Sequence, residues 1–353
     1  MNKEILLTED EFVVAKYDGI PEHVVHFWER IAWGNEGAVY QNMKVSSHIP
    51  LIVNPTLFAI ERDERILGTG VFSNMEISSG SDAYNCQYVR YFAMDPETRG
   101  QGIMKRFSLR GMLLVRGRET RKTVYFALVE RGNKASFKAV QNTGYTHVGT
   151  IKTFGFSRFF PKRKVNFSRL TDATDKELML SKLKEFYKNH SLVQFNPVFL
   201  DNQYVIIRDQ AGEILAGCQY HRCHWKVNRL PGKSGKLLLK LLPKIPLLNK
   251  IFNPEKFEFL AFEAIYFQLG KEHLLEQLFE SILHEEKLNA AMFWLDEKDP
   301  LVAIIGRTFS LGLIHGFLKK NDVCMMQDYH GLSEQEIQDF TARPFYASAF
   351  DYA

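Results

Sequence analysis

The chain has 353 residues, 45% of them hydrophobic and 24% charged, with 23 Gly and 12 Pro, which excludes a collagen-like, low-complexity or largely disordered protein. Such a length can bury a sizeable core and, at roughly 150 residues per domain, predicts two domains. The four cysteines are too few for a scaffold built on disulfides, and a net charge of +4 does not by itself indicate a nucleic-acid partner.

The N-terminal residues 1–12 mix Leu and Ile with Lys, Glu and Asp, so they lack the apolar core of a signal peptide. No stretch reaches the length of an uncharged membrane span, about 20 residues. The nearest, residues 301–318, is interrupted by Arg307 and His315. We therefore expect a cytoplasmic protein whose cysteines are reduced thiols.

Hydrophobic spacing predicts alternating strands and helices over the first part of the chain. Residues 12–16 form the first expected strand, and Pro21 opens a helix. The further elements expected there are strands at 58–61, 66–77 and 87–94, a helix at 103–118, a strand at 123–129, a short helix at 133–142 and a strand at 147–156.

A Pro-Lys-Arg-Lys run at residues 161–164 indicates a linker, after which the same order of elements returns without a residue-level repeat. The expected elements are a helix at 175–189, strands at 204–208, 214–227 and 257–267, a helix at 271–288, a strand at 290–295, a helical stretch at 300–311 and a strand at 323–327. We therefore predict two like domains of the α/β (α+β) class in tandem, residues 1–163 and 164–353.

Basic residues are concentrated in one segment. Residues 99–164 hold 16 Lys and Arg against two acids, Glu119 and Glu130, which is a net charge of +14. An anionic ligand beside this segment would explain the excess, and a solvated basic face is the alternative.

A glycine-rich turn joins an expected strand to an expected helix. The strand ends at Met94, Asp95 and Pro96 break it, and Gly100 and Gly102 come directly before the helix. Glycines let backbone N–H groups approach a ligand, and a helix N-terminus carries about half a positive charge. Three basic side chains add to this field: Arg99, Lys105 and Arg106. The turn therefore predicts a site for a pyrophosphate or a similar anion.

The turn has neither the Gly-Lys-Ser/Thr ending of a P-loop nor the Gly-x-Gly-x-x-Gly of a dinucleotide-binding fold. It resembles the cofactor turn of the GNAT superfamily of N-acyltransferases, whose pattern is Arg/Gln-x-x-Gly-x-Gly/Ala. Arg99 to Ile103 match this pattern, whereas Met104 stands at its last position in place of Gly or Ala.

A second element of that family follows at the right distance. It consists of a strand at 125–129, then Asn133, then a short helix that ends in Gly144 and Tyr145. The resemblance covers most of residues 1–163 and implies a mixed, mostly antiparallel, splayed sheet flanked by helices.

The resemblance also implies acetyl-CoA, or another acyl-CoA, as the donor, and no metal. The turn would hold the pyrophosphate, and the main chain of the preceding strand would pair with the pantetheine arm and could polarise the thioester carbonyl. Asn133 would reach the arm from the opposite side. The residues implied at this donor site are Phe92, Ala93, Met94, Arg99, Gly100, Gln101, Gly102, Ile103, Met104, Lys105 and Asn133.

The general acid and the general base are less evident. In this family a Tyr seven residues after the Asn usually protonates the departing thiolate, but here that position is Val140, and Phe137 cannot donate a proton either. Glu130, at the end of its strand, is the candidate base, followed by Glu76, with solvated or capping roles as the alternative. Three aromatic residues could line an acceptor pocket or pack in the core: Trp28, Trp33 and Tyr40.

The only Cys/His cluster has a spacing that matches none of the usual zinc pairs, so we expect no metal site there. Its members are Cys218, His221, Cys223 and His224.

Residues 226–256 hold eight Lys and Arg against one acid, Glu255. A basic amphipathic helix in this segment could touch a membrane surface or nucleic acid. Pro243 and Pro246 would cut such a helix short, so we favour a partly packed insertion with a solvated basic edge over either partner.

The second half lacks a comparable turn, because Gly270 stands alone and Glu272 lies beside it. We hypothesise that this domain has lost cofactor binding and shapes the acceptor site or the domain interface. The sequence thus predicts an N-acetyltransferase in which a small-molecule or peptide amine attacks acetyl-CoA directly in a ternary complex. Two alternatives stay open: a non-catalytic acyl-CoA sensor, and a tandem aminoacyl transferase that uses charged tRNA.

Overall fold

The computed structural model describes residues 2–34, 38–232, 235–318 and 321–349, whose strands join in one mixed sheet. The strands of the first half are β1 (Lys3–Glu9), β2 (Phe12–Asp18), β3 (Val39–Asn42), β4 (Pro55–Arg62), β5 (Arg65–Ser79), β6 (Asp82–Met94), β7 (Thr123–Glu130) and β8 (Thr146–Ser157). Those of the second half are β9 (Ser168–Arg169), β10 (Tyr204–Arg208), β11 (Ile214–Arg229), β12 (Phe257–Phe267), β13 (Ala290–Asp296) and β14 (Val323–His330).

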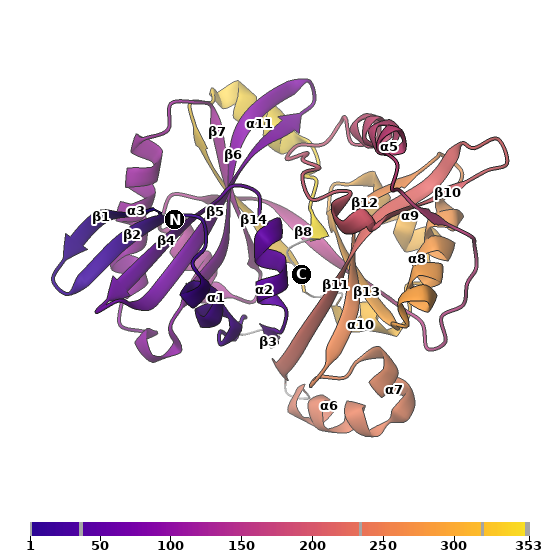
Figure 1. Ribbon diagram of the computed structural model, residues 1–353, viewed down its shortest axis with the longest axis horizontal. Coiled ribbons are helices and arrows are strands. Elements are labelled where there is room, and N and C mark those ends of the chain that lie inside the picture. The colour runs from indigo at the N-terminus through magenta and orange to yellow at the C-terminus, as the bar shows by residue number, and fades with distance from the viewer. Residues whose placement is uncertain (1, 35–37, 233–234, 319–320, 350–353) are drawn as a thin grey trace.

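Helices cover both faces of this sheet (Figure 1). They are α1 (Glu22–Glu29), α2 (Val45–His48), α3 (Ile103–Gly117) and α4 (Lys134–Gln141), then α5 (Ala173–Phe186), α6 (Gly235–Leu241), α7 (Pro246–Ile251), α8 (Glu272–Glu286), α9 (Pro300–Thr308), α10 (Leu313–Leu318) and α11 (Glu334–Ala342). Short 3₁₀ turns are η1 (Ile49–Leu51), η2 (Pro96–Thr98), η3 (Leu200–Asn202) and η4 (Leu242–Lys244). Side chains cap several helix starts, as Asp172, Asp299 and Ser333 do for α5, α9 and α11.

Alternation along β2 explains how the two faces are filled. Ala15 belongs to the core cluster that contains Trp28 of α1, whereas its neighbour Val14 packs with Phe107 of α3. Successive side chains of a strand point to opposite faces, so α1 and α3 cover opposite faces of the first half of the sheet.

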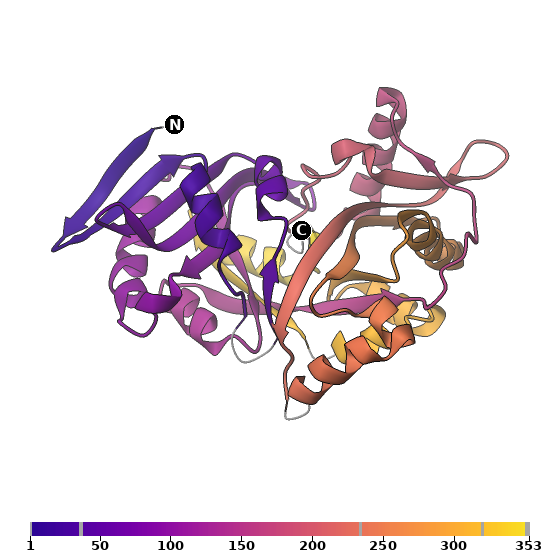
Figure 2. The same cartoon turned by 60° about the horizontal axis from the view of Figure 1, so that its bottom comes forward.

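The strand order is β1-β2-β4-β5-β6-β7-β14-β8-β13-β12-β11-β10-β9, with β3 paired to β11. Two pairs are parallel, β6 with β7 and β12 with β13, and the others are antiparallel. Figure 2 shows the β1–β2 hairpin at the outer edge of the first half.

The two halves exchange strands at the middle of the sheet. β14, from the end of the chain, lies between β7 and β8 of the first half, and β8 in turn pairs with β13 of the second half (Figure 1). The domain division between residues 163 and 164 stays a prediction. In the sheet, β14 of the second half pairs with β7 of the first half, and β8 of the first half pairs with β13 of the second half.

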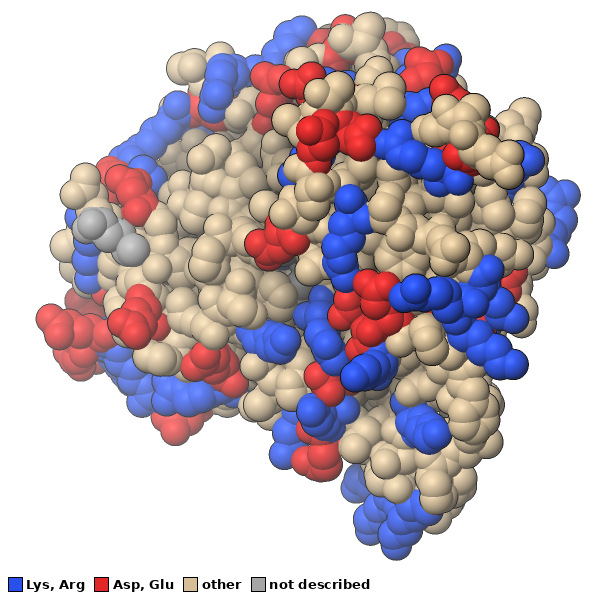
Figure 3. All heavy atoms as spheres, turned by 45° about the vertical axis from the view of Figure 1, so that its right-hand side comes forward, with Lys and Arg blue, Asp and Glu red and all other residues tan. Residues whose placement is uncertain are grey.

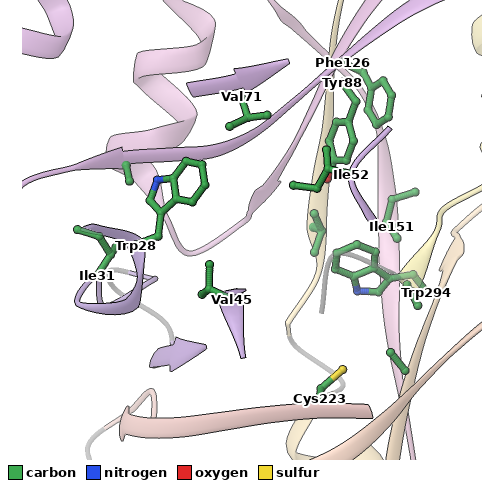
Figure 4. Close-up of a cluster of buried hydrophobic side chains, with 14 of the residues drawn as sticks. Trp28, Ile31, Val45, Ile52, Val71, Tyr88, Phe126, Ile151, Cys223 and Trp294 are labelled. Atoms are coloured by element: carbon green, nitrogen blue, oxygen red, sulfur yellow. The ribbon is translucent and has the colours of Figure 1, made fainter. Parts of the chain in front are cut away.

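One hydrophobic cluster extends across both halves. It includes Trp28, Val71 and Phe126 from the first half and Cys223 and Trp294 from the second, all buried (Figure 4). A shared core of this kind joins the halves through apolar packing as well as through the exchanged strands.

The predicted fold class is confirmed, and the bounds of β10 and β12 are those expected. The sequence did not predict β1, β3, β9, α2, α7, α10 and α11. β1 is an edge strand whose first residues, Lys3 and Glu4, are exposed, so its apolar alternation is weak. β3 has four residues and pairs with β11 of the other half, which no local pattern indicates.

Candidate active site

The parallel strands β6 and β7 diverge toward their carboxyl ends. Their pairing runs from Asn85 opposite Thr123 to Val89 opposite Ala127. Beyond these positions the last residues of β6 and β7 no longer pair with each other. The edge of β6 that faces β7 is therefore unpaired just before the glycine turn. The unpaired segment of β6 includes the predicted residues Phe92, Ala93 and Met94.

A bulge in β6 lies at the point of divergence. Tyr91 has φ of 49°, and the register with β5 shifts between Thr69 and Val71. The hydroxyl of Thr69 donates to the carbonyl of Tyr91 at 2.9 Å and accepts from the indole N–H of Trp28 at 2.9 Å. Trp28 also stacks on the Tyr91 ring at 4.4 Å. These contacts fix an unfavourable backbone conformation that re-aims the strand at the site.

The glycine turn is open in front of α3. Gly100 and Gly102 have φ of 82° and 78°, and a Cβ added to either would meet nothing within 4 Å. The first helical bond of α3 runs from the N–H of Arg106 to the carbonyl of Gly102, so the preceding N–H groups are not used by the helix. Together these features form a cradle that fits an anion.

The turn is held from the strand side by Asp95. Its carboxylate accepts from the N–H of Glu97 at 2.9 Å and from Arg65 at 2.8 Å. Burial alone would raise the pKa of Asp95, but these two hydrogen bonds outweigh it and lower the pKa. Asp95 therefore stays ionised and braces the start of the turn.

The charge concentration has a different explanation from the one the sequence suggested. Most of its basic side chains pair with acids that are distant in sequence. Such pairs are Arg106 with Glu9 and Asp10, Arg110 with Glu9, Arg118 with Glu4, Arg116 with Asp328, Lys122 with Glu336, Arg131 and Lys152 with Asp322, Arg158 with Glu276 and Glu280, and Arg163 with Glu285. The excess over residues 99–164 therefore does not by itself indicate a ligand.

Two cations at the turn are not among these pairs. Arg99 and Lys105 are exposed, and within the described part of the chain neither forms an ion pair with an acidic side chain. They flank Gly100–Gly102, so positive charge that the fold leaves unneutralised is placed where an anion would lie.

Asn133 is the N-cap of α4, where its side-chain oxygen accepts from the N–H of Ser136 at 3.2 Å. Val140, at the position where the family usually has a tyrosine, is buried. A contact of Asn133 with a pantetheine arm stays a prediction.

Glu130 is the last residue of β7, three residues beyond its last pairing with β6 at Ala127. Its side chain keeps some exposure, yet desolvation of the carboxyl group raises its pKa to about 7, against a smaller lowering by a hydrogen bond from Tyr40. The Tyr40 hydroxyl donates to the Glu130 carboxylate at 3.4 Å. A carboxyl group with a pKa near neutrality, placed at a site, has the property needed in a general base.

Tyr40 is held by the second half of the chain. Its strand β3 pairs with β11, and its ring stacks on Trp225 of β11 at 3.9 Å. On the other side of the site, Val323 of β14 lies opposite Glu130. The sequence named Tyr40 only as a core or pocket aromatic and did not indicate Trp225, because their contact depends on the pairing of β3 with β11.

The other residues singled out in the sequence lie elsewhere. Glu76 is exposed on β5 opposite Asn85, at the end of β6 remote from the turn. Trp28 is fully buried, and Trp33 packs edge-on against Tyr91. Trp28 therefore acts on the site through the Tyr91 bulge.

The second half has its own bulge and divergence, but these are filled by tyrosine hydroxyls. β12 pairs with β13 at Leu260 and Ala261 only, and Ala264 has φ of 47°. Tyr204 donates to the carbonyl of Ala264 at 2.9 Å, and Tyr187 to that of Ile265 at 2.8 Å. These bonds occupy two carbonyls of β12, whereas at the β6 bulge Thr69 donates to the carbonyl of Tyr91.

At the following turn, Glu272 accepts from the N–H of Gly270 at 3.0 Å. An acid already occupies the N–H group that an anion would need.

Among the described residues there is no group of three or more His, Cys, Asp or Glu able to hold a metal ion. All four cysteines are buried and free, and His221 bonds to Glu263 at 2.5 Å.

The basic insertion forms α6, η4 and α7 at the bottom of Figure 1, where Figure 3 shows mainly basic and uncharged residues. Leu242 and Ile251 are buried there, whereas Leu237 and Leu241 are exposed. No helix in the described ranges is long and apolar enough to cross a membrane.

No protein-family model matches the sequence, and no curated protein matches it. Solved structures do. The N-myristoyltransferase of Saccharomyces cerevisiae with bound myristoyl-CoA and inhibitors superposes with a TM-score of 0.61 at 8% identity, over 98% of this chain and 88% of that one. Another structure of that enzyme with bound myristoyl-CoA superposes with a TM-score of 0.60 at 8% identity, over 97% of this chain and 90% of that one.

A GCN5-related N-acetyltransferase from Anabaena variabilis gives a TM-score of 0.49 at 8% identity, over 89% of this chain and 72% of that one. The likeness to the N-myristoyltransferase shows that the chain has the fold of that enzyme.

Proposed function

We propose that this protein is an N-acyltransferase that takes its acyl group from acyl-CoA and passes it to an amine. The observation that carries the proposal is the open turn at Gly100–Gly102, which follows β6 after its divergence from β7. A carboxyl group with a raised pKa, Glu130, ends β7. Acetyl is the acyl group that the sequence resemblance implies. The acceptor is proposed to be a small molecule or a peptide, and the setting the reducing cytoplasm.

Acyl-CoA would fit the residues present. The cradle of Gly100 and Gly102 leaves room for a pyrophosphate, and Arg99 and Lys105 would pair with it. The bound thioester supplies the activated acyl carbon, and a main-chain N–H near Phe92 would polarise its carbonyl.

Glu130 would accept the proton that the amine must lose when it attacks. Its pKa of about 7 leaves it partly ionised near neutral pH, where a general base works best. Tyr40 orients the carboxylate, and because Trp225 stacks on Tyr40, the second half would contribute to catalysis by positioning the base.

The alternative of a non-catalytic acyl-CoA sensor rests on one observation, the buried Val140 in place of an acid. Release of CoA measured over a panel of amines separates the two functions. Turnover with any amine supports the transferase, and tight binding without turnover supports the sensor.

Replacing Gly102 by valine should abolish the thermal protection that acetyl-CoA gives. A β-branched residue strains the backbone at φ of 78° and places a side chain in the cradle. The measurement is the Tm with and without acetyl-CoA, because a ligand at about 100 times its Kd stabilises by about 2.7 kcal/mol.

The matched control for this variant is Gly212→Val. Gly212 has φ of 86° and equally open surroundings, but it lies in the turn between β10 and β11. This variant should lose a similar amount of stability and keep the acetyl-CoA shift. A shift retained in Gly102→Val would place acyl-CoA elsewhere, with the second half as the first place to look.

Replacing Tyr40 by phenylalanine should move the acidic limb of the pH profile of kcat/KM to higher pH. The hydroxyl donates to the Glu130 carboxylate and so favours its ionised form, which lowers its pKa. Removing the donor raises that pKa, so the base becomes active at higher pH. An unshifted limb would show that the titrating group is not Glu130.

A further inference from the structure

An elongated apolar cavity lies between α3 and the sheet. It encloses about 670 Å³ of space between atoms, part of it open to solvent. Its floor comes from β2, β4, β5, β6 and β7, and its roof mostly from α3. The buried residues beside it form two clusters, one with Ile103 and Phe107 and the other with Met112 and Val140. The cavity therefore divides what would otherwise be one core under α3.

The strand register shows how far the cavity extends. At one end Val14 of β2 lies opposite Ile60 of β4, which lies opposite Gly68 of β5. At the other end Val89 of β6 lies opposite Ala127 of β7, where these strands diverge. The floor thus crosses four strand spacings, about 19 Å at about 4.8 Å each. The end at Val89 lies where the main chain of β6 becomes unpaired, and Met104 in the first turn of α3 also lines the cavity.

Glycines lie on both sides of the cavity. A Cβ on Gly111 of α3 would meet nothing within 4 Å, although Gly111 lies in the roof. Above Gly68, a Cβ would come within 2.8 Å of the sulfur of Met94 and 3.2 Å of the methyl group of Met104. Methionine side chains are flexible, so these two can adapt where the cavity meets the turn.

The lining excludes polar ligands. No charged side chain contributes to it, and its hydroxyl groups come from Thr69, Ser108, Thr143 and Tyr145 among mainly aliphatic and aromatic residues. A cavity lined mainly by apolar side chains favours a hydrocarbon occupant. One lipid acyl chain is about 15 Å long, half of the about 30 Å hydrocarbon core of a bilayer, so one chain is shorter than the floor of the cavity.

We propose that this cavity holds the hydrocarbon tail of the donor, so that the preferred co-substrate is a medium- or long-chain fatty acyl-CoA and the transferred group is that fatty acyl chain. The proposal rests on the proposed function, because it attaches the tail to a thioester whose pyrophosphate lies at Gly100–Gly102. It explains why the core is divided at α3 and why the gap starts where β6 and β7 part.

The test compares CoA, acetyl-CoA, octanoyl-CoA, dodecanoyl-CoA and hexadecanoyl-CoA by calorimetric titration of the full chain. Each buried methylene should raise affinity about fourfold until the cavity is filled, so dodecanoyl-CoA should bind at least about a hundredfold more tightly than acetyl-CoA. Equal affinity along the series would overturn the inference and leave the proposed function standing.

Gly111→Leu provides the matching variant, because its side chain would enter the cavity while leucine favours a helix more than glycine does. It should weaken dodecanoyl-CoA at least about tenfold and leave acetyl-CoA unchanged. Gly117→Leu, in the exposed last turn of the same helix, should change neither the affinity for dodecanoyl-CoA nor that for acetyl-CoA. Unaltered dodecanoyl-CoA binding by Gly111→Leu would overturn the inference.

Free dodecanoate separates a tail site from a fatty-acid site. We expect it to bind far more weakly than dodecanoyl-CoA, since it cannot reach the turn. If dodecanoate binds and is blocked by Gly111→Leu while CoA and all its esters fail to bind, the cavity is a fatty-acid site, and both this inference and the proposed function are wrong.

Discussion

Replacing Glu130 by glutamine is expected to lower kcat/KM for amine acylation by about 10²–10⁴-fold, the contribution typical of a general base. Glutamine keeps the size of the side chain and its contact with Tyr40, but it cannot accept a proton. The measurement is CoA release with the amine that gives the fastest turnover, over a range of pH. The acidic limb of the parent profile should lie near the Glu130 pKa of about 7 and should be absent from the residual activity of the variant.

The same variant should be at least as stable as the parent at pH 8. The pKa of Glu130 is raised from 4.5 to about 7 in the folded protein, so between these values the folded state binds more protons than the unfolded state. The stability that depends on this group therefore falls as the pH rises from about 4.5 through 7. Glutamine removes this penalty, and the Tm at pH 8 should be equal or higher.

The control is Glu76→Gln, which changes an exposed carboxylate remote from the turn and should leave both kcat/KM and Tm unchanged. If Glu130→Gln kept activity within about threefold of the parent, the proton would leave by another route. Reduced activity together with a reduced Tm at pH 8 would instead assign Glu130 a structural role.

The glycine turn could be predicted from sequence because its physics is local. A strand, a break, two glycines and a helix start are neighbours along the chain, and the positive φ at Gly100 and Gly102 is the conformation that glycine permits. The absence of a tyrosine at position 140 could likewise be predicted, because that position lies seven residues after Asn133. Features that depend on residues close together in the sequence could therefore be predicted from it.

The surroundings of Glu130 could not be predicted in this way. Its raised pKa depends on desolvation, and its hydrogen bond depends on Tyr40, which Trp225 supports from the other half. The basic segment shows the same limit, because Glu9 and Asp328 neutralise Arg110 and Arg116 from opposite ends of the chain. Only the fold brings these groups together.

A fragment of residues 1–163 expressed alone is expected to be insoluble or unfolded. It would lose β14, which pairs with β7 from Val323 opposite Glu130 to His330 opposite Thr123 and with β8 on its other edge. Four β14 side chains are buried against the first half: Val323, Cys324, Met325 and Met326. At roughly 1.5–3 kcal/mol for each large apolar side chain, their loss is comparable with the whole stability of a domain, about 5–15 kcal/mol.

Two constructions separate the missing strand from the cut itself. Coexpression with residues 164–353 should restore a soluble complex, because it returns β14 and the shared core. A fragment in which a flexible linker joins residue 163 to residues 321–332 should recover part of the solubility, because it returns β14 alone. If residues 1–163 alone unfolded cooperatively by calorimetry as a soluble monomer, the halves would be independent domains, and β14 would be an addition to a sheet already stable without it.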